Sequence, residues 1–368
     1  MSERKNLRVL ILFEVHEPAE PDASYEKYMA EDPQWQTEGH VVAALRANGH
    51  EVHFGAIYQN PREVIDLMER IRPDLVWNSV EAFHEHRYYE ANVVALLELL
   101  KVPYTGSDSR SLMLCQDKAL SKKILKHHRV GVPPFVVSPR NQPLKKVPKS
   151  MFPVLVKPLA EEGSVGIARD SFCEDEEKDL KRAAFLHERY KQDVILEQYI
   201  DGTELYAGVL GDGRLQVLPP RELKFANVPE GEPKVASFKA KWDDEYRQRW
   251  GIHSTFPEAL PEKVGRDLAS VARRTFRALR LRGYARVDMR LTAEGKLFVV
   301  EANPNPQIAR HEDFAEAAAK AGIGYDQLIE RIVRLALRVS PPSGQRVTGM
   351  RLLRGLTASL SAATQSPS

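Results

Sequence analysis

The first third of the chain alternates short apolar runs with longer amphipathic segments. The runs at 9–13, 52–57 and 75–78 predict buried strands. Helices are predicted at 36–47, which ends at an Asn-Gly pair, at 61–71, which opens on a proline, and at 90–100. Strands and helices that alternate at this spacing predict an α/β domain with an open parallel sheet, in which ligands bind at the carboxyl ends of the strands.

The rest of the chain has a less regular pattern of strands and helices. A basic helix is predicted at 117–128, strands at 152–157, 194–198 and 204–210, and a further helix at 262–281. A long polar stretch at 220–261 precedes that helix, and this mixed order predicts an α+β fold. The end of the chain, 339–368, begins with Pro-Pro-Ser-Gly and is rich in Ser, Thr and Ala, which predicts a linker and a flexible tail.

Two apolar strand-like runs, 286–290 and 297–303, are joined by a glycine-containing turn of hairpin length. Side chains two apart on a strand share a face, so Glu301 and Asn303 point the same way, and a hairpin brings Asp288 to that face. Two carboxylates and an amide oxygen suit Mg²⁺, and Arg286 on the same face suits a phosphate. The alternative is a solvated face of the hairpin, and the gathering of four such groups favours the metal–phosphate interpretation.

Composition narrows the class of protein without identifying it. The 368 residues suffice for two or three domains, and 43% hydrophobic with 28% charged residues is ordinary for a soluble globular protein. A net charge of +2 gives no electrostatic reason to expect a nucleic-acid or membrane partner. The two cysteines, Cys115 and Cys173, lack metal-ligand spacing and indicate a reducing compartment. Without a signal-peptide core or an apolar run of membrane-spanning length, we expect a cytoplasmic protein.

Two further segments carry groups suited to a nucleotide. Lys157 ends an apolar strand and is followed by Glu-Glu-Gly-Ser-Val-Gly at 161–166, whose backbone N–H groups suit phosphate oxygens. Glu197 and Glu204 flank a bend at 201–202, where exposed backbone suits adenine and a carboxylate suits ribose hydroxyls. Taken singly, each segment has an ordinary alternative: a lysine that reaches solvent in the first case, and a plain strand–turn–strand in the second.

The order of these motifs resembles the ATP-grasp superfamily and, more narrowly, the D-alanine–D-alanine ligase family. The resemblance runs from about residue 97 to about residue 337 and rests on Pro-Tyr-Thr-Gly-Ser at 103–107, Asp-Lys at 117–118, Val-Lys-Pro at 156–158, Gly-Ser-Val-Gly at 163–166, Glu197 and Glu204, Arg-Val-Asp at 286–288 and Glu-Ala-Asn at 301–303. It implies an N-terminal α/β substrate domain at 1–106, then two α+β lobes that clasp ATP, a central lobe at 107–202 and a C-terminal lobe at 203–338, with the tail at 339–368.

The resemblance also implies a role for each matching residue. It implies that Lys118, Lys157 and Lys241 contact the phosphates of ATP, Lys241 at the γ-phosphate, and that Gly163, Ser164 and Gly166 lie in the loop over them. It also implies that Glu197, Gln198 and Ile200 form the hinge that contacts adenine, and that Glu204 accepts hydrogen bonds from the ribose. The Mg²⁺ ligands are Asp288, Glu301 and Asn303, and two ions are expected, with Mn²⁺ as a substitute. The catalytic candidates are Arg286, which would stabilise the reaction intermediate, Ser164 and Lys241.

The implied reaction is ATP-dependent formation of an amide or peptide bond. A carboxylate attacks the γ-phosphate to give an acylphosphate and ADP, and an amine then displaces phosphate through a tetrahedral intermediate. The expected partners are small-molecule amino acids or amines, and the resemblance also suggests a homodimer. Two alternatives stay open: a ligase for other amino acids or amines in a secondary pathway, and a catalytically silent ATP-binding scaffold. The complete set of metal ligands argues against the scaffold.

The substrate side of the chain departs from the family pattern. The glycine-rich loop that follows the family's first strand is absent at 13–18. Glu312 falls near the place of a serine that meets the acceptor carboxylate, and like charges repel. Trp242 stands where a tyrosine is common, and Arg310 and His311 are other sources of positive charge. The hypothesis that follows is an intact ATP half combined with a substrate pair other than two D-alanines.

Overall fold

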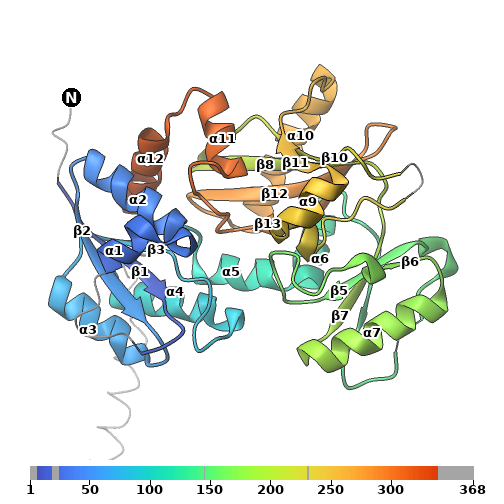
Figure 1. Ribbon diagram of the computed structural model, residues 1–368, viewed down its shortest axis with the longest axis horizontal. Helices are drawn as coiled ribbons and strands as arrows, with labels where there is room; N and C mark the ends of the chain where they lie inside the picture. The colour runs from blue at the N-terminus through green and yellow to red at the C-terminus, as the bar shows by residue number, and fades with distance from the viewer. Residues whose placement is uncertain (1–5, 19–24, 145, 230–231, 339–368) are drawn as a thin grey trace, which may run out of the picture.

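Three sheets organise the residues that the computed structural model describes, which are 6–18, 25–144, 146–229 and 232–338 (Figure 1). The first sheet is parallel, in the order β2-β1-β3, and consists of β1 (Arg8–Glu14), β2 (Glu51–Ile57) and β3 (Leu75–Asn78). Its helices are α1 (Tyr25–Glu31), α2 (Gln36–Ala47), α3 (Pro61–Ile71) and α4 (Glu90–Leu100). The predicted parallel sheet is confirmed, and so are the helices at 36–47, 61–71 and 90–100.

Helix α3 begins and ends where its sequence favours a boundary. The side chain of Asn60 accepts a hydrogen bond from Arg62 N at 3.0 Å, and Pro61 occupies the first turn, where an N–H would lack a helical partner. Val64, Leu67 and Met68 follow at helical spacing and are buried. The chain then turns at Arg72, which has a left-handed backbone conformation, and continues into β3, which ends at the carboxyl edge of the sheet.

The second sheet is antiparallel and follows two helices that lead out of the N-terminal domain. These helices are α5 (Ser109–Gln116) and α6 (Lys118–His127). The sheet has the order β4-β7-β5-β6, with β4 (Phe135–Ser138), β5 (Val154–Pro158), β6 (Phe172–Cys173) and β7 (Val194–Gln198). Helix α7 (Glu176–Tyr190) packs against β5, β6 and β7. The strand predicted at 194–198 has those bounds, and the strand predicted at 152–157 is shifted to β5.

The third sheet is antiparallel and carries the predicted hairpin. Its order is β11-β10-β8-β12-β13, with β9 also beside β8, and its strands are β8 (Thr203–Asp212), β9 (Arg214–Val217), β10 (Arg221–Phe225), β11 (Ile252–Thr255), β12 (Tyr284–Leu291) and β13 (Leu297–Asn303). Helix α10 (Glu262–Ala278) places Leu268, Ala272 and Phe276, four residues apart, in the core beneath this sheet. The hairpin predicted from alternation is therefore confirmed as β12–β13.

The polar stretch at 220–261 contains more regular structure than its sequence suggested. Strands β10 and β11 lie in it, together with α8 (Phe238–Trp242) and α9 (Asp244–Trp250). The two strands form one edge of the third sheet, and of the four residues of β11 only Ile252 is buried. A half-exposed edge strand needs few apolar residues, which is why the composition of this stretch concealed it.

The remaining regular elements are short or stand at the end of the described chain. Single 3₁₀ turns occur as η1 (Pro33–Trp35), η2 (Arg87–Tyr89), η3 (Lys149–Met151) and η4 (Arg169–Ser171), and the last helices are α11 (Asp313–Lys320) and α12 (Tyr325–Arg338). Across the residues that the structure describes, no helix has both the length and the apolar character needed to cross a bilayer.

The end of the described chain returns to the N-terminal sheet. Ile329, Ile332 and Val333 of α12 belong to the same buried cluster as Val9 and Ile11 of β1. Packing between α12 and α2 is visible in Figure 1, where the dark red helix lies beside the blue one. The domain boundaries at 106, 202 and 338 stay predictions, and this cluster joins residues from the first and the last predicted domain. The predicted tail at 339–368 lies outside the described residues.

Replacing Ile329 with alanine tests whether α12 is part of the N-terminal core. Ile329 is fully buried, so we expect the variant to lower the free energy of unfolding by about 2–5 kcal/mol, measured by urea denaturation. Leu337 on the same helix is 37% exposed, so Leu337→Ala should cost much less. Equal effects of the two substitutions would contradict a core role for α12.

Candidate active site

The hairpin β12–β13 presents four polar side chains to one face of the third sheet. Arg286 pairs with Asn303 across the strands, and Asp288 pairs with Glu301. Residues directly opposite in an antiparallel pair point to the same side, as do residues two apart, so all four share a face. Asp288 and Glu301 line one cavity, and Arg286, Glu301 and Asn303 line a second. The face predicted from the sequence thus forms the wall between two cavities.

A β-bulge in the hairpin shapes this wall. Asp288 pairs with Glu301 but the next residue, Met289, pairs with Val299, so Val300 is the extra residue on β13. A bulge breaks the strict alternation of a strand and re-aims neighbouring side chains. As a result Val300 and Glu301, although adjacent in sequence, both line the first cavity, while the Val300 carbonyl accepts a hydrogen bond from Lys122 Nζ.

Arg286 and Asp288 form a two-pronged ion pair. Arg286 Nε lies 2.7 Å from Asp288 Oδ1, and the guanidinium also donates to Oδ2 at 3.0 Å. Burial works against the charged guanidinium, yet the Asp288 carboxylate beside it raises the pKa of Arg286. The guanidinium also lies over the Tyr206 ring, 4.8 Å from its centroid. Arg286 is therefore held at the boundary of both cavities as a fixed positive charge.

The donor set of this face fits a hard divalent cation such as Mg²⁺. Asp288 and Glu301 supply carboxylate oxygens, and the Asn303 side-chain oxygen accepts a hydrogen bond from Asn305 N at 3.0 Å. Mg²⁺ is commonly held by one or two carboxylates and completes its coordination with water and substrate phosphates. Within the described residues, no three His, Cys, Asp or Glu side chains form a metal-holding group by themselves. A cation on this face would therefore depend on phosphate oxygens for its remaining ligands.

Glu197 of β7 is buried between two lysines at the back of the first cavity. Its carboxylate lies 2.8 Å from Lys157 Nζ and 3.1 Å from Lys122 Nζ, and these three residues are each about 2% exposed. Burial alone would raise the pKa of Glu197, but the two lysines hold it below the ordinary value. Burial lowers the pKa of Lys122 to about 8 despite the attraction of Glu197. Lys122 was not singled out from the sequence.

Lys118 stands at the first position of α6 and faces Glu301 across the cavity. The side chain of Asp117 caps the helix by accepting a hydrogen bond from Leu120 N at 2.8 Å. Lys118 Nζ lies 3.0 Å from Glu301 Oε1 and also donates to the Glu161 carbonyl. Burial opposes ionisation of Glu301, yet Lys118, Lys157 and Lys241 together lower its pKa to about 2. The cavity floor is thus rich in positive charge, as a site for phosphates requires.

Two loops close over the first cavity and are hydrogen-bonded to each other. Ser164 Oγ donates to the Ala236 carbonyl at 2.7 Å, and Trp242 Nε1 donates to the Gly163 carbonyl at 3.0 Å. Ser164 has a left-handed φ of 65°, and Gly163 and Gly166 in the same loop also have left-handed φ values. A side chain at Gly166 would also collide with Pro158, whose Cγ lies 2.5 Å from the Cβ position. We call this loop and the segment 236–242 that is bonded to it the lid, of which Ser164, Ala236 and Lys241 line the first cavity.

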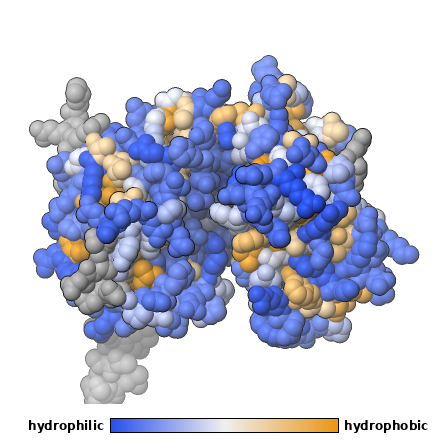
Figure 2. Space-filling view, viewed as in Figure 1, coloured by the Kyte–Doolittle hydropathy of each residue, from blue (hydrophilic) through white to orange (hydrophobic). Residues whose placement is uncertain are grey.

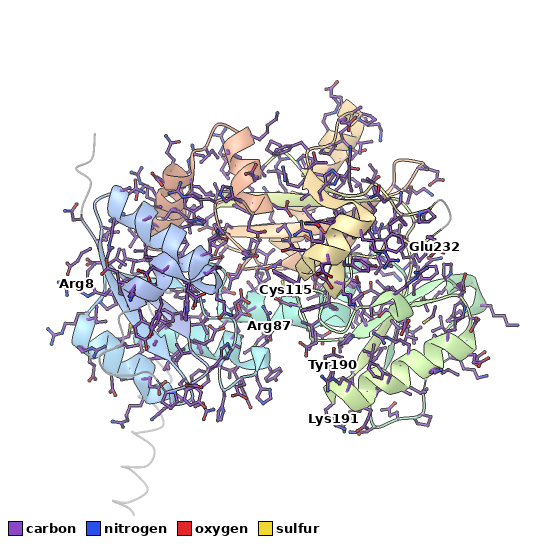
Figure 3. All side chains as sticks on the ribbon, viewed as in Figure 1. Arg8, Arg87, Cys115, Tyr190, Lys191 and Glu232 are labelled. Atoms are coloured by element: carbon purple, nitrogen blue, oxygen red, sulfur yellow. The ribbon has the colours of Figure 1, made fainter. Side chains whose placement is uncertain are left out.

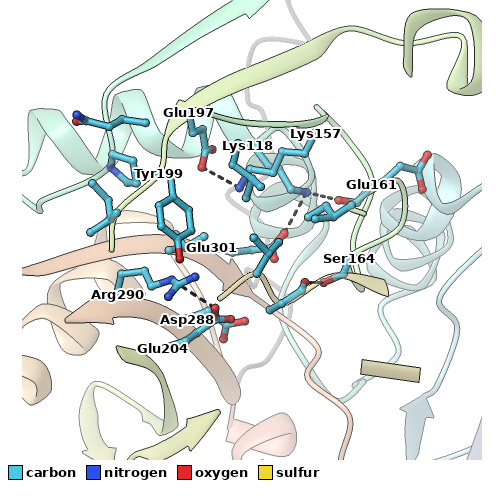
Figure 4. Close-up of a pocket in the computed structure, with 18 of the residues that line it drawn as sticks. Lys118, Lys157, Glu161, Ser164, Glu197, Tyr199, Glu204, Asp288, Arg290 and Glu301 are labelled. Atoms are coloured by element: carbon cyan, nitrogen blue, oxygen red, sulfur yellow. Dashed lines mark hydrogen bonds and ion pairs between the residues drawn. The ribbon is translucent and has the colours of Figure 1, made fainter. Parts of the chain in front are cut away.

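The opposite end of the first cavity is formed by β7, β8 and β12. Glu204 accepts a hydrogen bond from the Tyr206 hydroxyl at 2.9 Å and lies 3.5 Å from Arg290 Nε. Arg290 also donates to the Gly202 carbonyl at 2.9 Å and lies over the Tyr199 ring. Figure 4 shows Tyr199, Arg290 and Glu204 together at this end of the cavity, away from the lysines.

Most of the predicted site residues line the first cavity. These are Lys118, Lys157, Ser164, Glu197, Gln198, Ile200, Glu204, Lys241, Asp288 and Glu301 (Figure 4). Arg286, Gly163 and Asn303 line the second cavity instead, and Gly166 lines neither, because it lies at the base of the lid. The first cavity also contains Tyr199 and Arg290, which sequence reasoning missed. Lys122 follows Lys118 by one helical turn, which places the two on one face of the helix but does not indicate that Lys122 is buried.

The second cavity has a volume of about 410 Å³ and lies between the N-terminal domain and the C-terminal lobe. Figure 2 shows a hollow between these two halves of the molecule, bordered mostly by hydrophilic residues. Arg87, labelled in Figure 3, lies on its N-terminal side, 3.2 Å from Glu81 and 3.5 Å from Glu162 of the lid loop. Lys241 and Glu301 line both cavities, so the two are contiguous.

The fold of this chain is shared by solved ligase structures. It aligns with the crystal structure of D-alanine–D-alanine ligase from Bacillus anthracis complexed with ATP at a TM-score of 0.70, with 23% sequence identity over 92% of this chain and 100% of that one. The D-alanine–D-alanine ligase of Coxiella burnetii aligns at a TM-score of 0.66 with 18% identity, over 98% of this chain and 99% of that one. The architecture is therefore that of the ATP-grasp ligases.

Sequence comparison narrows that class to one family. A family model described as D-ala D-ala ligase C-terminus matches residues 131–334. The D-alanine–D-alanine ligase of Pelotomaculum thermopropionicum is 32% identical over 282 residues, which cover 74% of this chain and 84% of that protein. The "uncharacterized protein y4sG" of Sinorhizobium fredii is 32% identical over 316 residues, 83% of this chain and 89% of that protein. This chain belongs to the D-alanine–D-alanine ligase family, a family of ATP-dependent, ADP-forming ligases.

Replacing Lys122 with methionine tests the buried lysine that the sequence did not reveal. Loss of its charge should weaken ATP binding about tenfold at pH 7, measured by isothermal titration calorimetry, because one of the two cations that hold Glu197 is gone. Lys123 is exposed and adjacent, so Lys123→Met is the matched control. Wild-type affinity in Lys122→Met would contradict a role for Lys122 in the site.

The same variant has a signature in the pH dependence of binding. Burial lowers the pKa of Lys122 to about 8, and a nearby polyanion such as ATP raises a lysine pKa, so binding takes up a proton above pH 8. Wild-type affinity should therefore fall as the pH rises through about 8, and this inflection should be missing from Lys122→Met. An identical pH profile in both proteins would assign the inflection to another group.

Proposed function

We propose that the two contiguous cavities carry out the two halves of an amide-forming reaction. ATP binds in the first cavity, and the carboxylate and the amine meet in the second. A carboxylate attacks the γ-phosphate to give ADP and an acylphosphate, and the amine then displaces inorganic phosphate from the acyl carbon. The observation that carries this proposal is the wall between the cavities, where Glu301 and Lys241 face both sides.

The lysines of the first cavity neutralise the phosphates. Lys118 and Lys157 approach from α6 and β5, and Lys241 approaches from α8, which belongs to the lid. Phosphoryl transfer needs mainly positioning and charge stabilisation, which converging lysines supply without any covalent step. Glu197, Gln198 and Ile200 face the adenine, and Glu204, fixed by Tyr206 and Arg290, accepts the ribose hydroxyls.

Asp288, Glu301 and Asn303 would hold Mg²⁺ on the shared wall. The bound metal supplies Lewis-acid stabilisation of charge on the phosphate oxygens. Two ions are part of this proposal, and Mn²⁺ suits the same oxygen ligands. Arg286 is placed beside these ligands and stabilises the oxyanion that forms when the amine adds to the acyl carbon.

The lid protects the reactive intermediate from water. An acylphosphate hydrolyses if water reaches it, so the site must close before the γ-phosphate is transferred. The hydrogen bonds from Ser164 to Ala236 and from Trp242 to Gly163 join the two lid loops above the phosphates. Ser164 therefore acts by holding the lid closed as well as by facing the nucleotide.

The proposal also includes the substrates, the cellular location and the oligomeric state. The substrates are small-molecule amino acids or amines, the enzyme acts in the cytoplasm, and two copies form a homodimer. The N-terminal domain supplies the substrate side through Glu81 and Arg87, which follow β3, and the residues at 107–202 and 203–338 form the two lobes around ATP.

Replacing Asp288 with asparagine tests the metal-dependent chemistry. Loss of one carboxylate ligand should lower ADP release by about 100-fold or more, because a metal ion contributes several kcal/mol of charge stabilisation. ADP release is measured with a coupled assay across a panel of amino acids and amines, with and without Mg²⁺. ATP binding without Mg²⁺, measured by calorimetry, should change far less.

Glu294→Gln is the matched control for this measurement. Glu294 is exposed in the turn of the same hairpin and faces neither cavity. Tight ATP binding with no ADP release from the wild-type protein, whatever carboxylate and amine are supplied, would instead support the non-catalytic scaffold.

A further inference from the structure

The lid borders the second cavity as well as the first. Glu162 and Gly163 of the lid loop line the second cavity, together with Lys241 and Trp242 of the segment bonded to that loop. Arg87 lines the same cavity from the N-terminal domain, and its guanidinium lies 3.5 Å from Glu162 Oε2. The second cavity therefore contains an ion pair that joins the lid to the N-terminal domain.

Other polar contacts of the lid loop stay within the two predicted lobes around the first cavity. The Glu161 carboxylate accepts a hydrogen bond from Gln192 Nε2 at 2.7 Å, and the Gly166 carbonyl accepts one from the Arg182 guanidinium at 3.0 Å. Ser164 and Trp242 bond the lid loop to the segment 236–242, as described above. These contacts fix the lid on the nucleotide side, whereas the pair with Arg87 connects it to the domain of the first sheet.

Arg87 is presented to the lid by a tightly folded loop. Phe83 N donates a hydrogen bond to the His86 carbonyl at 3.2 Å, and His86 N donates one to the Phe83 carbonyl at 3.0 Å, so the chain folds back on itself directly before Arg87. Gln116 of α5 then donates to the Arg87 carbonyl through Nε2 at 2.8 Å. A guanidinium on a backbone fixed in this way is a ready partner for a carboxylate that approaches it.

Several carboxylates act on Arg87. Its guanidinium lies 3.2 Å from Glu81 Oε2, and Glu90 and Glu14 act on it at longer range. Burial opposes the charged guanidinium, yet the neighbouring carboxylates raise the pKa of Arg87. Burial also raises the pKa of Glu162, and Arg87 is the cation that most offsets this effect. Without Arg87, closure of the lid would bring the charge of Glu162 close to other carboxylates, and like charges repel.

We propose that Arg87 is a positioning residue that holds the lid closed over the second cavity until the amine has reacted. Arg87 acts through Glu162 rather than on the reacting atoms. This inference rests on the proposed ligase function. If the lid opens early, water attacks the acyl carbon and the bond from that carbon to the phosphate oxygen breaks, which returns the carboxylate and releases inorganic phosphate. ATP is then converted to ADP and phosphate without formation of an amide.

The test measures the amide product and ADP in the same reaction. ADP is followed with the coupled assay and the amide by mass spectrometry, with the carboxylate and amine of the panel that give the fastest ADP release in the wild type. The wild type should form amide and ADP in nearly equal amounts. Arg87→Gln should lower the ratio of amide to ADP by about tenfold, the range expected for loss of a charge-assisted contact. Arg87→Lys keeps the charge and should restore most of the ratio, whereas a purely structural role would lower amide and ADP together.

A double variant separates attraction from repulsion. In Arg87→Gln the charge of Glu162 still faces Glu81, and in Arg87→Gln/Glu162→Gln that repulsion is gone, so the double variant should have the higher ratio of amide to ADP. Arg70 is exposed on α3, so Arg70→Gln is the matched control and should keep the wild-type ratio.

Hydrogen–deuterium exchange of the lid tests the same contact without turnover. With Mg²⁺ and the non-hydrolysable analogue β,γ-imido-ATP, backbone amides at 161–166 should exchange about tenfold faster in Arg87→Gln than in the wild type, because the closed lid is less populated. Arg70→Gln should exchange as the wild type does.

Two results would overturn the role of Arg87 while leaving the ligase function intact. One is a wild-type ratio of amide to ADP in Arg87→Gln, and the other is wild-type exchange of its lid. Absence of ADP release from the wild type with every compound in the panel is a different result. It would remove the proposed function itself, and with it the acylphosphate that the lid is proposed to protect.

Discussion

The buried ion cluster of Glu197, Lys122 and Lys157 is the contact on which the geometry of the nucleotide cavity depends. Its members come from β7, α6 and β5. Lys122 also donates a hydrogen bond to the Val300 carbonyl, which connects the cluster to β13. Charges removed from water are stable only when they are paired and hydrogen-bonded, so each of these elements can occupy only a narrow range of positions. The two sheets that enclose the cavity are thereby fixed relative to each other where the phosphates would lie.

The hairpin could be predicted because the residues that determine it are close together in the sequence. Alternation with a period of two decides which residues share a face, and the glycine turn brings the two strands together, so Asp288, Glu301 and Asn303 follow from spacing alone. Lys122 and Arg290 did not follow, because a lysine on a basic helix and an arginine on a strand usually reach solvent. Their burial depends on partners distant in sequence, the Val300 carbonyl freed by a bulge and the Gly202 carbonyl at a bend.

Tertiary packing explains what else the sequence could not reveal. Helix α12 is amphipathic, which predicts a buried face but not the surface that buries it, and only the structure shows it against β1 and α2. Strand β11 is an edge strand and β10 is its neighbour, and the exposed side of each accepts polar residues, so no apolar run marks them. The same reasoning applies to Arg310, which was a candidate for the substrate side by its position in sequence but is drawn away by Asp326 and Tyr325.

The two cavities differ in how many of their charged side chains already have an ion-pair partner within the protein. Around the first cavity, the acidic side chains Glu197, Glu204 and Glu301 already have basic partners, so a change there disturbs several contacts at once. Around the second cavity, the side chains of Arg247, Glu312 and Lys241 have no hydrogen bond or ion pair among the described residues, so a substitution there alters the cavity lining without breaking an internal pair. The lining of the second cavity can therefore change by single substitution more readily than the lining of the first. The physical reason is that the charged side chains of Arg247, Glu312 and Lys241 are not held by partners within the described part of the protein.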